Sequence, residues 1–371
     1  MTSTAAMRWV VAGGGTGGHV TPALALAERI AARGDDVWLL GSAHGLETRL
    51  VPESGFELVA LPSRQVMGRT TLARVGSVLA IARSCFEAWR LLRARRSEIV
   101  VSVGGYASVP AVLAAAALRL PLALVEPNAR PGRANRLAAR LASRIFVQFE
   151  AAARALSRRA GDARVSAPGI PLRAALVHAF ADAPPRRAPE PPFRVLVFGG
   201  SQGARQINEA MMQAAPRLDP DRVRIFHQTG EADRERVSAA WAAAGIEAEV
   251  VAFEPDMPRR YREADLAVCR AGALTVAELA MAGLPSLLVP YPYAADDHQA
   301  ANARALADAG AARVLPSRPL SGSDVVAALE ALFAAPEQLV AMAASAAKLA
   351  RPDAALDIIE ACAELCAASR E

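Results

Sequence analysis

Two glycine-rich loops, each lying between an apolar strand and a helix, constrain the fold of this chain more than any other feature. The first follows the segment MRWVVA and has the sequence GGGTGGH, which ends at His19. The second, GGSQGA, covers Gly199–Ala204 after the segment FRVLVF. A strand that turns into a helix through glycines leaves backbone N–H groups and a positive dipole end facing one point, which favours an anion such as phosphate. One loop in each half predicts two Rossmann-like domains that face a cleft.

The rest of the chain supports this division. Apolar runs alternate with amphipathic segments in both halves, as in α/β folds with parallel sheets. The proline-rich segment 179–192 suits neither helix nor sheet and is interpreted as a linker. We therefore expect domains at 1–178 and 193–345, with a helix at 346–371 that packs back on the first domain. Strands are expected at Trp9–Ala12, Val37–Leu40, Ile99–Val103, Leu122–Val125, Arg144–Gln148, Val195–Phe198, Val223–His227, Glu249–Phe253, Leu266–Cys269 and Ser286–Val289, and the segment Pro336–Ala368 is expected to be helical.

Charge is distributed unevenly between the halves. Residues 1–192 hold 25 arginines against 13 acidic residues, whereas the whole chain has a net charge of +5. A basic first half favours an anionic partner: a membrane surface, a polyanionic substrate or nucleic acid. The four cysteines have no metal-binding or redox spacing, which favours a reducing compartment. With no signal peptide and no apolar run of membrane-spanning length, a soluble or peripheral protein is expected.

The first loop contains the spacing G-x-G-x-x-G, which is also found in dinucleotide-binding proteins. Those proteins place an acidic residue at the end of the second strand to bind the ribose, but here VWLL ends in Gly41-Ser42. His19 lies at a helix N-terminus, where the dipole favours the neutral imidazole, so it could accept a proton from a hydroxyl nucleophile. The alternative for His19 is a capping or packing role.

Two later segments carry polar groups. In CRAGALTVAEL, a helix is expected to begin near Thr275, and Glu278 could accept hydrogen bonds from the vicinal hydroxyls of a ribose. Thr275 and Glu278 also have the spacing of a capping box, which is the structural alternative. The segment YPYAADDHQAAN favours a sugar-contacting loop over a metal site, because adjacent side chains in an extended loop point in alternate directions.

Seven motifs together resemble the MurG family of glycosyltransferases, in order and over nearly the whole chain. They are GGGTGGH, SVGGYAS, GGSQGA, HQTG, Asp256-Met257 with Tyr261, CRAGALTVAELAMAGLPSLLVPYP and HQAANA. The resemblance implies the GT-B fold, two Rossmann-like domains with a central cleft. It also implies inverting transfer of N-acetylglucosamine from UDP-N-acetylglucosamine to the 4-hydroxyl of undecaprenyl-diphosphate-linked MurNAc-peptide, the acceptor bound mainly by the first domain.

The resemblance also assigns residues. Gly104, Gly105 and Tyr106 would bind the acceptor diphosphate, and Glu254 falls where the family contacts uracil, through backbone groups. The remaining donor-binding positions would be Thr16, Gly17, Gly18, Asn128, Arg173, Ser201, Ala273, Leu274, Thr275, Val276, Ala277, Glu278 and Gln299. The chain departs from the family motifs at Val125, Pro127 and Ile170, so roles of the His, Gln and Asn usual there do not transfer.

An inverting displacement needs a base on the acceptor side. His19 is the expected base and Glu126 the alternative. No Asp-x-Asp metal motif stands out at a strand end, so helix N-termini and Arg173 are expected to stabilise the leaving UDP without a bound metal or other cofactor.

The lipid-linked acceptor requires contact with a membrane. In the segment Thr70–Arg96, arginines flank an apolar set, which favours docking on an anionic membrane surface. That set is Leu72, Val75, Leu79, Phe86 and Trp89. A core-packed helix with a basic solvated edge is the alternative. The expected location is the cytoplasmic face of the bacterial membrane, as a peripheral protein.

Two other functions compete with this interpretation. A different GT-B enzyme would share the donor half and differ near Gly104–Ser108 and Thr70–Arg96. A non-catalytic protein that binds nucleotide sugars or nucleic acid is the second. Nucleic acid is not expected as a partner. Aromatic residues make up only 5% of the chain, and no basic run is interleaved with them, as stacking on single strands would need.

Overall fold

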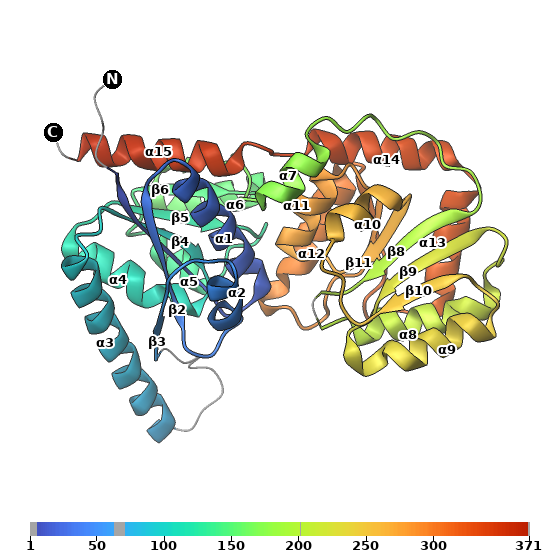
Figure 1. Cartoon of the computed structure of the whole chain (residues 1–371), viewed down its shortest axis with the longest axis horizontal. Coiled ribbons are helices and arrows are strands. Elements are labelled where there is room, and N and C mark those ends of the chain that lie inside the picture. Colours follow the sequence, from blue (N-terminus) through green and yellow to red (C-terminus); the bar gives the residue numbers. More distant parts are fainter. Residues whose placement is uncertain (1–5, 63–70, 201, 370–371) are drawn as a thin grey trace. The chain divides into compact units, whose positions relative to one another are not determined.

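The structure, a computed structural model, describes residues 6–62, 71–200 and 202–369, without side chains for 71–79. The chain divides into two compact units: Met1–Ala174 with Arg351–Glu371, and Ala175–Ala350. Each unit is built on one open sheet in which every recorded strand pair is parallel (Figure 1). The α/β class and the two Rossmann-like sheets expected from the sequence are confirmed.

The first unit contains a seven-stranded sheet in the order β3-β2-β1-β4-β5-β6-β7. Its strands are β1 (Arg8–Gly13), β2 (Asp36–Ser42), β3 (Leu58–Leu61), β4 (Ile99–Gly104), β5 (Leu122–Glu126), β6 (Arg144–Val147) and β7 (Val165–Ser166). Its helices are α1 (Gly17–Ala32), α2 (Glu47–Glu53), α3 (Thr71–Ala94), α4 (Val109–Leu118), α5 (Arg133–Ala138), α6 (Glu150–Ala160) and α15 (Ala354–Ala368).

Alternating apolar residues bury both faces of this sheet. Val10 and Ala12 of β1 pack in one core with residues of α3, α4, α5 and α6. Trp9 and Val11 are also fully buried, and α1 contacts β1, β2 and β4. Because side chains alternate along a strand, these two residues lie on the opposite face, the face that α1 covers. Helix α15 packs against α1, so this C-terminal helix belongs to the first unit.

The second unit contains a six-stranded sheet in the order β10-β9-β8-β11-β12-β13. Its strands are β8 (Phe193–Phe198), β9 (Val223–Gln228), β10 (Ala248–Val251), β11 (Leu266–Cys269), β12 (Ser286–Leu288) and β13 (Ala312–Val314). Its helices are α8 (Arg205–Ala214), α9 (Arg234–Ala243), α10 (Met257–Glu263), α11 (Ala273–Met281), α12 (His298–Asp308), α13 (Gly322–Phe333) and α14 (Pro336–Lys348), and α7 (Ala174–Phe180) begins at the junction of the units.

The proline-rich segment 179–192 is attached to the second unit by Arg186. The Arg186 guanidinium donates hydrogen bonds to Ala264 O at 2.5 Å, Tyr261 O at 2.6 Å and Ala282 O at 3.3 Å. Ala264 and Ala282 are the C-cap residues of α10 and α11. Carbonyls at a helix C-terminus lack partners within the helix, so one side chain satisfies the ends of two helices.

The structure differs from the expected elements at the sheet edges and at the C-terminus. Strands β3, β7 and β13 are missing from the sequence-based prediction; each has four residues or fewer and lies at an edge of its sheet. The predicted strand at Glu249–Phe253 ends at Val251. The segment Pro336–Ala368 forms two helices, α14 and α15, rather than one continuous helix.

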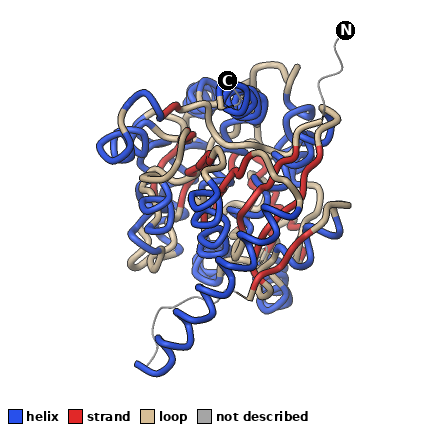
Figure 2. Tube along the Cα trace, turned by 90° about the vertical axis from the view of Figure 1, so that its left-hand side faces the viewer, coloured by secondary structure: helices blue, strands red, loops and turns tan. Residues whose placement is uncertain are grey.

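Within the described residues, no single helix is both long and apolar enough to cross a membrane. Helices α13 and α14 meet the length and composition together, but they are bent by 95°. Helix α3 extends beyond the other elements of its unit at its N-terminal end (Figures 1 and 2).

Candidate functional site

Each sheet has one point where the strand order reverses, and both glycine loops lie there. In the first sheet, β1 is followed in sequence by β2 on one side and is paired with β4 on the other. In the second sheet, β8 lies in the same way between β9 and β11. Loops at such a point diverge, and open α/β sheets bind ligands there, outside the carboxyl ends of the strands. The topology therefore selects the loops after β1 and β4, and those after β8 and β11.

The first glycine loop already holds an anion, which is the buried carboxylate of Glu47. Its Oε2 accepts from the Gly15 N–H at 2.8 Å. Its Oε1 accepts from the N–H and the hydroxyl of Ser42, both at 2.9 Å. Sequence reasoning missed this residue, although an acid soon after the end of the second strand was the available signal. One loop amide that could bind phosphate is thus occupied by the protein itself.

His19 lies in the first turn of α1, beside the loop after β4. The Thr16 Oγ1 is 3.0 Å from His19 Nδ1. A Cβ at Gly105, where φ is +81°, would lie 2.6 Å from Gly14 O and 3.5 Å from His19 Nδ1. Only glycine permits this close approach. The structure therefore brings the predicted base next to the predicted acceptor loop.

Tyr106 and Gly104 complete this loop. The Tyr106 hydroxyl is 3.3 Å from Ser42 Oγ, and its ring is 3.0 Å from where a Cβ of Gly15 would lie. A Cβ at Gly104 would lie 2.8 Å from the Asn135 amide. All three predicted acceptor residues thus lie in one packed loop against the first glycine loop.

Glu126, the alternative base, is buried at the end of β5 and fully engaged. Its Oε1 accepts from Asn128 N at 2.9 Å, and its Oε2 accepts from Gly132 N at 3.1 Å and Asn135 Nδ2 at 2.8 Å. Burial raises the pKa of Glu126, while these hydrogen bonds lower it. Glu126 therefore holds the loop that carries Asn128. Both of its carboxylate oxygens already accept hydrogen bonds from that segment.

Arg173 lies at the start of the segment leading to α7 and pairs with Glu28 of α1 at 2.6 Å. The pair is partly exposed. Its guanidinium is therefore held over the helix that begins at the first glycine loop.

In the second unit, the glycine loop and the loop after β9 interlock through their backbones. A Cβ at Gly203 would lie 1.7 Å from Thr229 O, and one at Gly230 would lie 2.1 Å from Gln202 O. Gln228 ties three segments, because its Nε2 donates to Gly200 O at 2.7 Å and its Oε1 accepts from Glu254 N at 3.2 Å. Ser201 lies outside the described residues.

The side chain of Glu254 is turned to Arg260, whose Nε donates to it at 2.7 Å. The neighbouring Phe253 is 58% exposed and was not singled out from the sequence. An exposed aromatic face beside a polar backbone suits stacking with a base.

A buried network supports the loop after β9. Trp241 Nε1 donates to His227 Nδ1 at 3.3 Å, so the ring proton is on Nε2, which lies 3.1 Å from Asn208 Oδ1. Asn208 Nδ2 in turn donates to Thr229 O at 3.0 Å. Burial lowers the pKa of His227 to about 3. The network needs the neutral ring.

Helix α11 begins at Ala273, two residues before Thr275 and close to the predicted start, with Gly272 as its N-cap. The capping-box interpretation of Thr275 and Glu278 is therefore wrong, since both lie inside the helix. Ala273, Leu274 and Thr275 form its first turn, followed by Val276, Ala277 and Glu278. Tyr261 OH donates to Glu278 Oε2 at 2.8 Å, and burial raises the pKa of Glu278 to about 7. The helix presents the positive end of its dipole and a carboxylate on adjoining turns.

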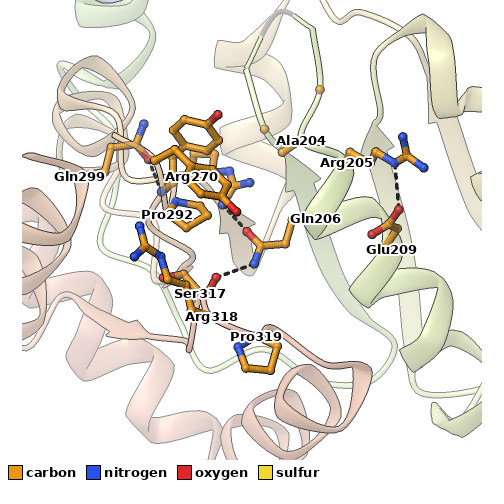
Figure 3. A pocket seen from close by; sticks show the side chains of 14 residues that line it. Ala204, Arg205, Gln206, Glu209, Arg270, Pro292, Gln299, Ser317, Arg318 and Pro319 are labelled. Carbon is orange, nitrogen blue, oxygen red and sulfur yellow. Dashed lines mark hydrogen bonds and ion pairs between the residues drawn. The ribbon is translucent and has the colours of Figure 1, made fainter. Parts of the chain in front are cut away.

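A pocket of about 850 Å³ lies at the carboxyl edge of the second sheet, lined by residues that follow β8, β11, β12 and β13 (Figure 3). Gln299 lines it, together with Arg270, Gln206 and Tyr291. Gln299 Oε1 accepts from Tyr291 N at 2.8 Å. This volume is typical of small-molecule sites.

The predicted membrane residues are only partly described. The side chains of Leu72, Val75 and Leu79 lie outside the described part. Phe86 is 63% exposed and stacks on Trp89, with ring centroids 6.0 Å apart, and Arg93 lies over Trp89. Among the described residues, no group of three His, Cys, Asp or Glu side chains could hold a metal ion.

Comparison with known proteins agrees with the two-unit division. Residues 9–147 match the glycosyltransferase family 28 N-terminal domain, and residues 194–358 match the family 28 C-terminal domain.

Curated relatives match over nearly the whole chain. A protein of Anaeromyxobacter dehalogenans (strain 2CP-1) is 43% identical over 97% of this chain and 93% of its own length. One of Geobacter metallireducens is 39% identical over 95% and 97%. Both are named UDP-N-acetylglucosamine–N-acetylmuramyl-(pentapeptide) pyrophosphoryl-undecaprenol N-acetylglucosamine transferase.

Solved structures share the fold. Acinetobacter baumannii MurG superposes with a TM-score of 0.79 at 30% identity, covering 96% of this chain and 99% of that one. The UDP-GlcNAc 2-epimerase of Neisseria meningitidis, at 13% identity and a TM-score of 0.68 over 95% and 99%, shares the fold alone.

Proposed function

The chain belongs to glycosyltransferase family 28, and we propose that it transfers N-acetylglucosamine from UDP-N-acetylglucosamine to a lipid-linked N-acetylmuramyl-peptide acceptor. The observation that carries the proposal is the start of α11, where the helix N-terminus and the Glu278 carboxylate follow Arg270, a residue that lines the 850 Å³ pocket. Amides at a helix N-terminus suit a diphosphate, and a carboxylate suits two vicinal ribose hydroxyls. The exposed ring of Phe253 and the backbone of Glu254 would meet the uracil.

We propose that the reaction is a single inverting displacement. The 4-hydroxyl oxygen of the N-acetylmuramyl unit forms a bond to C1 of the donor sugar while the bond from C1 to the UDP oxygen breaks. His19 takes the hydroxyl proton at Nε2. That role requires the other ring proton to be on Nδ1 and to be donated to Thr16 Oγ1, which lies 3.0 Å away. The Thr16 hydroxyl can accept this hydrogen bond, so the contact is compatible with the required tautomer.

UDP leaves with an additional negative charge. The dipole at the N-terminus of α11 stabilises it without reorganising during the reaction. Arg173 is the cation that the family resemblance assigns to the diphosphate. We propose that these groups suffice and that no bound metal takes part.

We assign Glu126 a positioning role rather than that of the base. Its oxygens already accept hydrogen bonds from the segment 128–135, so that a conformational change would be needed to expose one. Through Asn128 it holds a predicted donor-binding residue in place.

The acceptor lipid places the reaction at a membrane surface. We propose that α3 docks on the cytoplasmic face, with Phe86 and Trp89 inserted and arginines on anionic headgroups. The support is the exposed Phe86 ring stacked on Trp89, which is half-buried against the core and lies beside Arg93, and the extension of α3 from its unit (Figure 2). Apolar rings next to basic residues are typical of interfacial helices.

The decisive experiment is transfer of labelled N-acetylglucosamine from UDP-N-acetylglucosamine to undecaprenyl-diphosphate-MurNAc-pentapeptide in detergent or vesicles. We expect a β-linked product, formed equally well after chelator treatment. UDP-glucose is the matched donor control. A requirement for a divalent ion would contradict the metal-free step. If the donor is hydrolysed and no label reaches the acceptor, the transferase proposal is contradicted.

A further inference from the structure

We propose that Arg270 and Gln206 are positioning residues that fix the Gln299 side chain as a hydrogen-bond donor to the sugar of the donor substrate. The inference rests on the proposed function, because it concerns the same donor site. It adds that selectivity for the sugar depends on residues that need not touch it.

Arg270 lies at the end of β11 and fixes the loop after β12. It is 8% exposed. Its Nη1 donates to Val289 O and Pro290 O, both at 3.2 Å, and the guanidinium lies 5.4 Å from the centre of the Tyr291 ring. Two carbonyls and one ring of consecutive residues are thus held by one side chain. The next backbone group, Tyr291 N–H, is the one that binds Gln299.

Gln206 links Arg270 to two further loops. Its Oε1 accepts from Arg270 Nη1 at 3.0 Å, and its Nε2 donates to Ser317 O at 2.7 Å. Gln206 lies in the first turn of α8, after the second glycine loop, and Ser317 lies after β13. The loops after β8, β11, β12 and β13 are therefore joined by one chain of hydrogen bonds along the pocket (Figure 3).

This chain determines which end of Gln299 faces the pocket. A backbone N–H can only donate, so the atom 2.8 Å from Tyr291 N must be the amide oxygen. The amide nitrogen is then turned away from that bond, as Figure 3 shows. Gln299 lines the pocket, and its Nε2 carries two protons for sugar oxygens. Movement of Tyr291 would release the amide to rotate.

The position of the network supports a role beyond stability. Burial lowers the pKa of Arg270, which shows that placing this cation here has a cost. A buried cation held on neutral carbonyls and an amide, next to the donor pocket, is an arrangement that stability alone does not require.

The test measures how much the sugar contributes to binding. Titration calorimetry on the full chain gives dissociation constants for UDP-N-acetylglucosamine and for UDP, and their ratio isolates the sugar. Q299E keeps the acceptor for Tyr291 N–H but replaces the donor with an oxygen, so we expect the ratio to worsen roughly 10- to 100-fold with UDP affinity unchanged. R270K and Q206A are each expected to worsen it roughly 10-fold.

A double variant separates positioning from structural damage. If Arg270 acts through Gln299, R270K/Q299E should be no worse than Q299E alone. Arg224→Lys, at an exposed ion pair on β9, is the matched control. Effects that multiply in the double variant, or equal losses of UDP and UDP-N-acetylglucosamine affinity, would overturn the inference. The binding ratio does not depend on the acceptor, so failure of the transfer assay alone would count only against the proposed function.

Discussion

Replacing Arg186 with Met should destabilise the second unit by about 3 kcal/mol, because three backbone carbonyls lose a charged hydrogen-bond donor. Arg186 donates to Ala264 O, Tyr261 O and Ala282 O, at the ends of α10 and α11. These two helices carry Tyr261 and Glu278. The variant therefore tests whether the proline-rich segment supports the donor site.

The magnitude follows from two opposing terms. A hydrogen bond from a charged donor contributes about 1.5–3 kcal/mol, and an unsatisfied buried carbonyl costs about 1–3 kcal/mol. Against this, burial lowers the pKa of Arg186, so removing the cation recovers part of a desolvation cost. Methionine fills much of the volume of the arginine stem. A net loss of about 3 kcal/mol corresponds to a fall in Tm of about 6–12 °C for a unit of this size.

The assay is urea unfolding combined with hydrogen exchange followed by mass spectrometry. Protection should fall first in the last turns of α10 and α11. Arg187→Met changes the exposed neighbouring arginine and should be neutral. Arg186→Lys, with one ammonium for three carbonyls, should lie between. If the free energies of unfolding of Arg186→Met and Arg187→Met differ by less than about 0.5 kcal/mol, as is usual for a surface substitution, the reasoning is refuted.

Four further predictions concern catalysis, pH and the membrane. His19→Ala should lower transfer roughly 10²- to 10⁴-fold with UDP affinity retained; transfer at the wild-type rate would refute the base. Burial raises the pKa of Glu278 to about 7, and the ionised form accepts the ribose hydroxyls. The affinity for uridine should therefore fall about tenfold for each pH unit below 7. The affinity of E278Q for uridine should not change with pH. Burial lowers the pKa of His227 from 6.5 to about 3, so between these pH values the unfolded chain is protonated there and the folded chain is not. The free energy of unfolding should therefore fall by about 1.4 kcal/mol for each pH unit as the pH drops through this range. The variant His227→Gln should lack this slope. F86S/W89S should weaken sedimentation with phosphatidylglycerol vesicles but not UDP binding; unchanged sedimentation would place docking elsewhere.

The sequence predicts most of the fold because its strongest signals are local. The strands at the two glycine loops are long and apolar, and α8 follows directly after the loop Gly199–Ala204. Strand β7 has two residues and β13 three, so neither shows a period. The Thr275–Glu278 spacing resembles a capping box, but Gly272 takes the N-cap position and α11 begins two residues before Thr275.

The site is predicted less completely because its remaining parts depend on contacts between distant residues. His19 and Gly105 are far apart in the chain, and their proximity follows from the pairing of β1 with β4. The hydrogen bonds to Glu126 come from Asn128, Gly132 and Asn135, and they depend on the turn after β5, which no short motif predicts. The Arg270–Gln206 network joins four loops, and no residue in it belongs to a recognisable short pattern.

Because Glu47 binds the first glycine loop, the two similar loops differ in whether they can bind a nucleotide. The Gly15 amide of the first loop already donates to an internal carboxylate, so it is not available to a nucleotide phosphate. In the second unit, the described contacts of the loop are to backbone and neutral amide groups. A chain with two apparent phosphate loops should thus bind one nucleotide rather than two, and counting glycine motifs would overestimate its capacity by a factor of two.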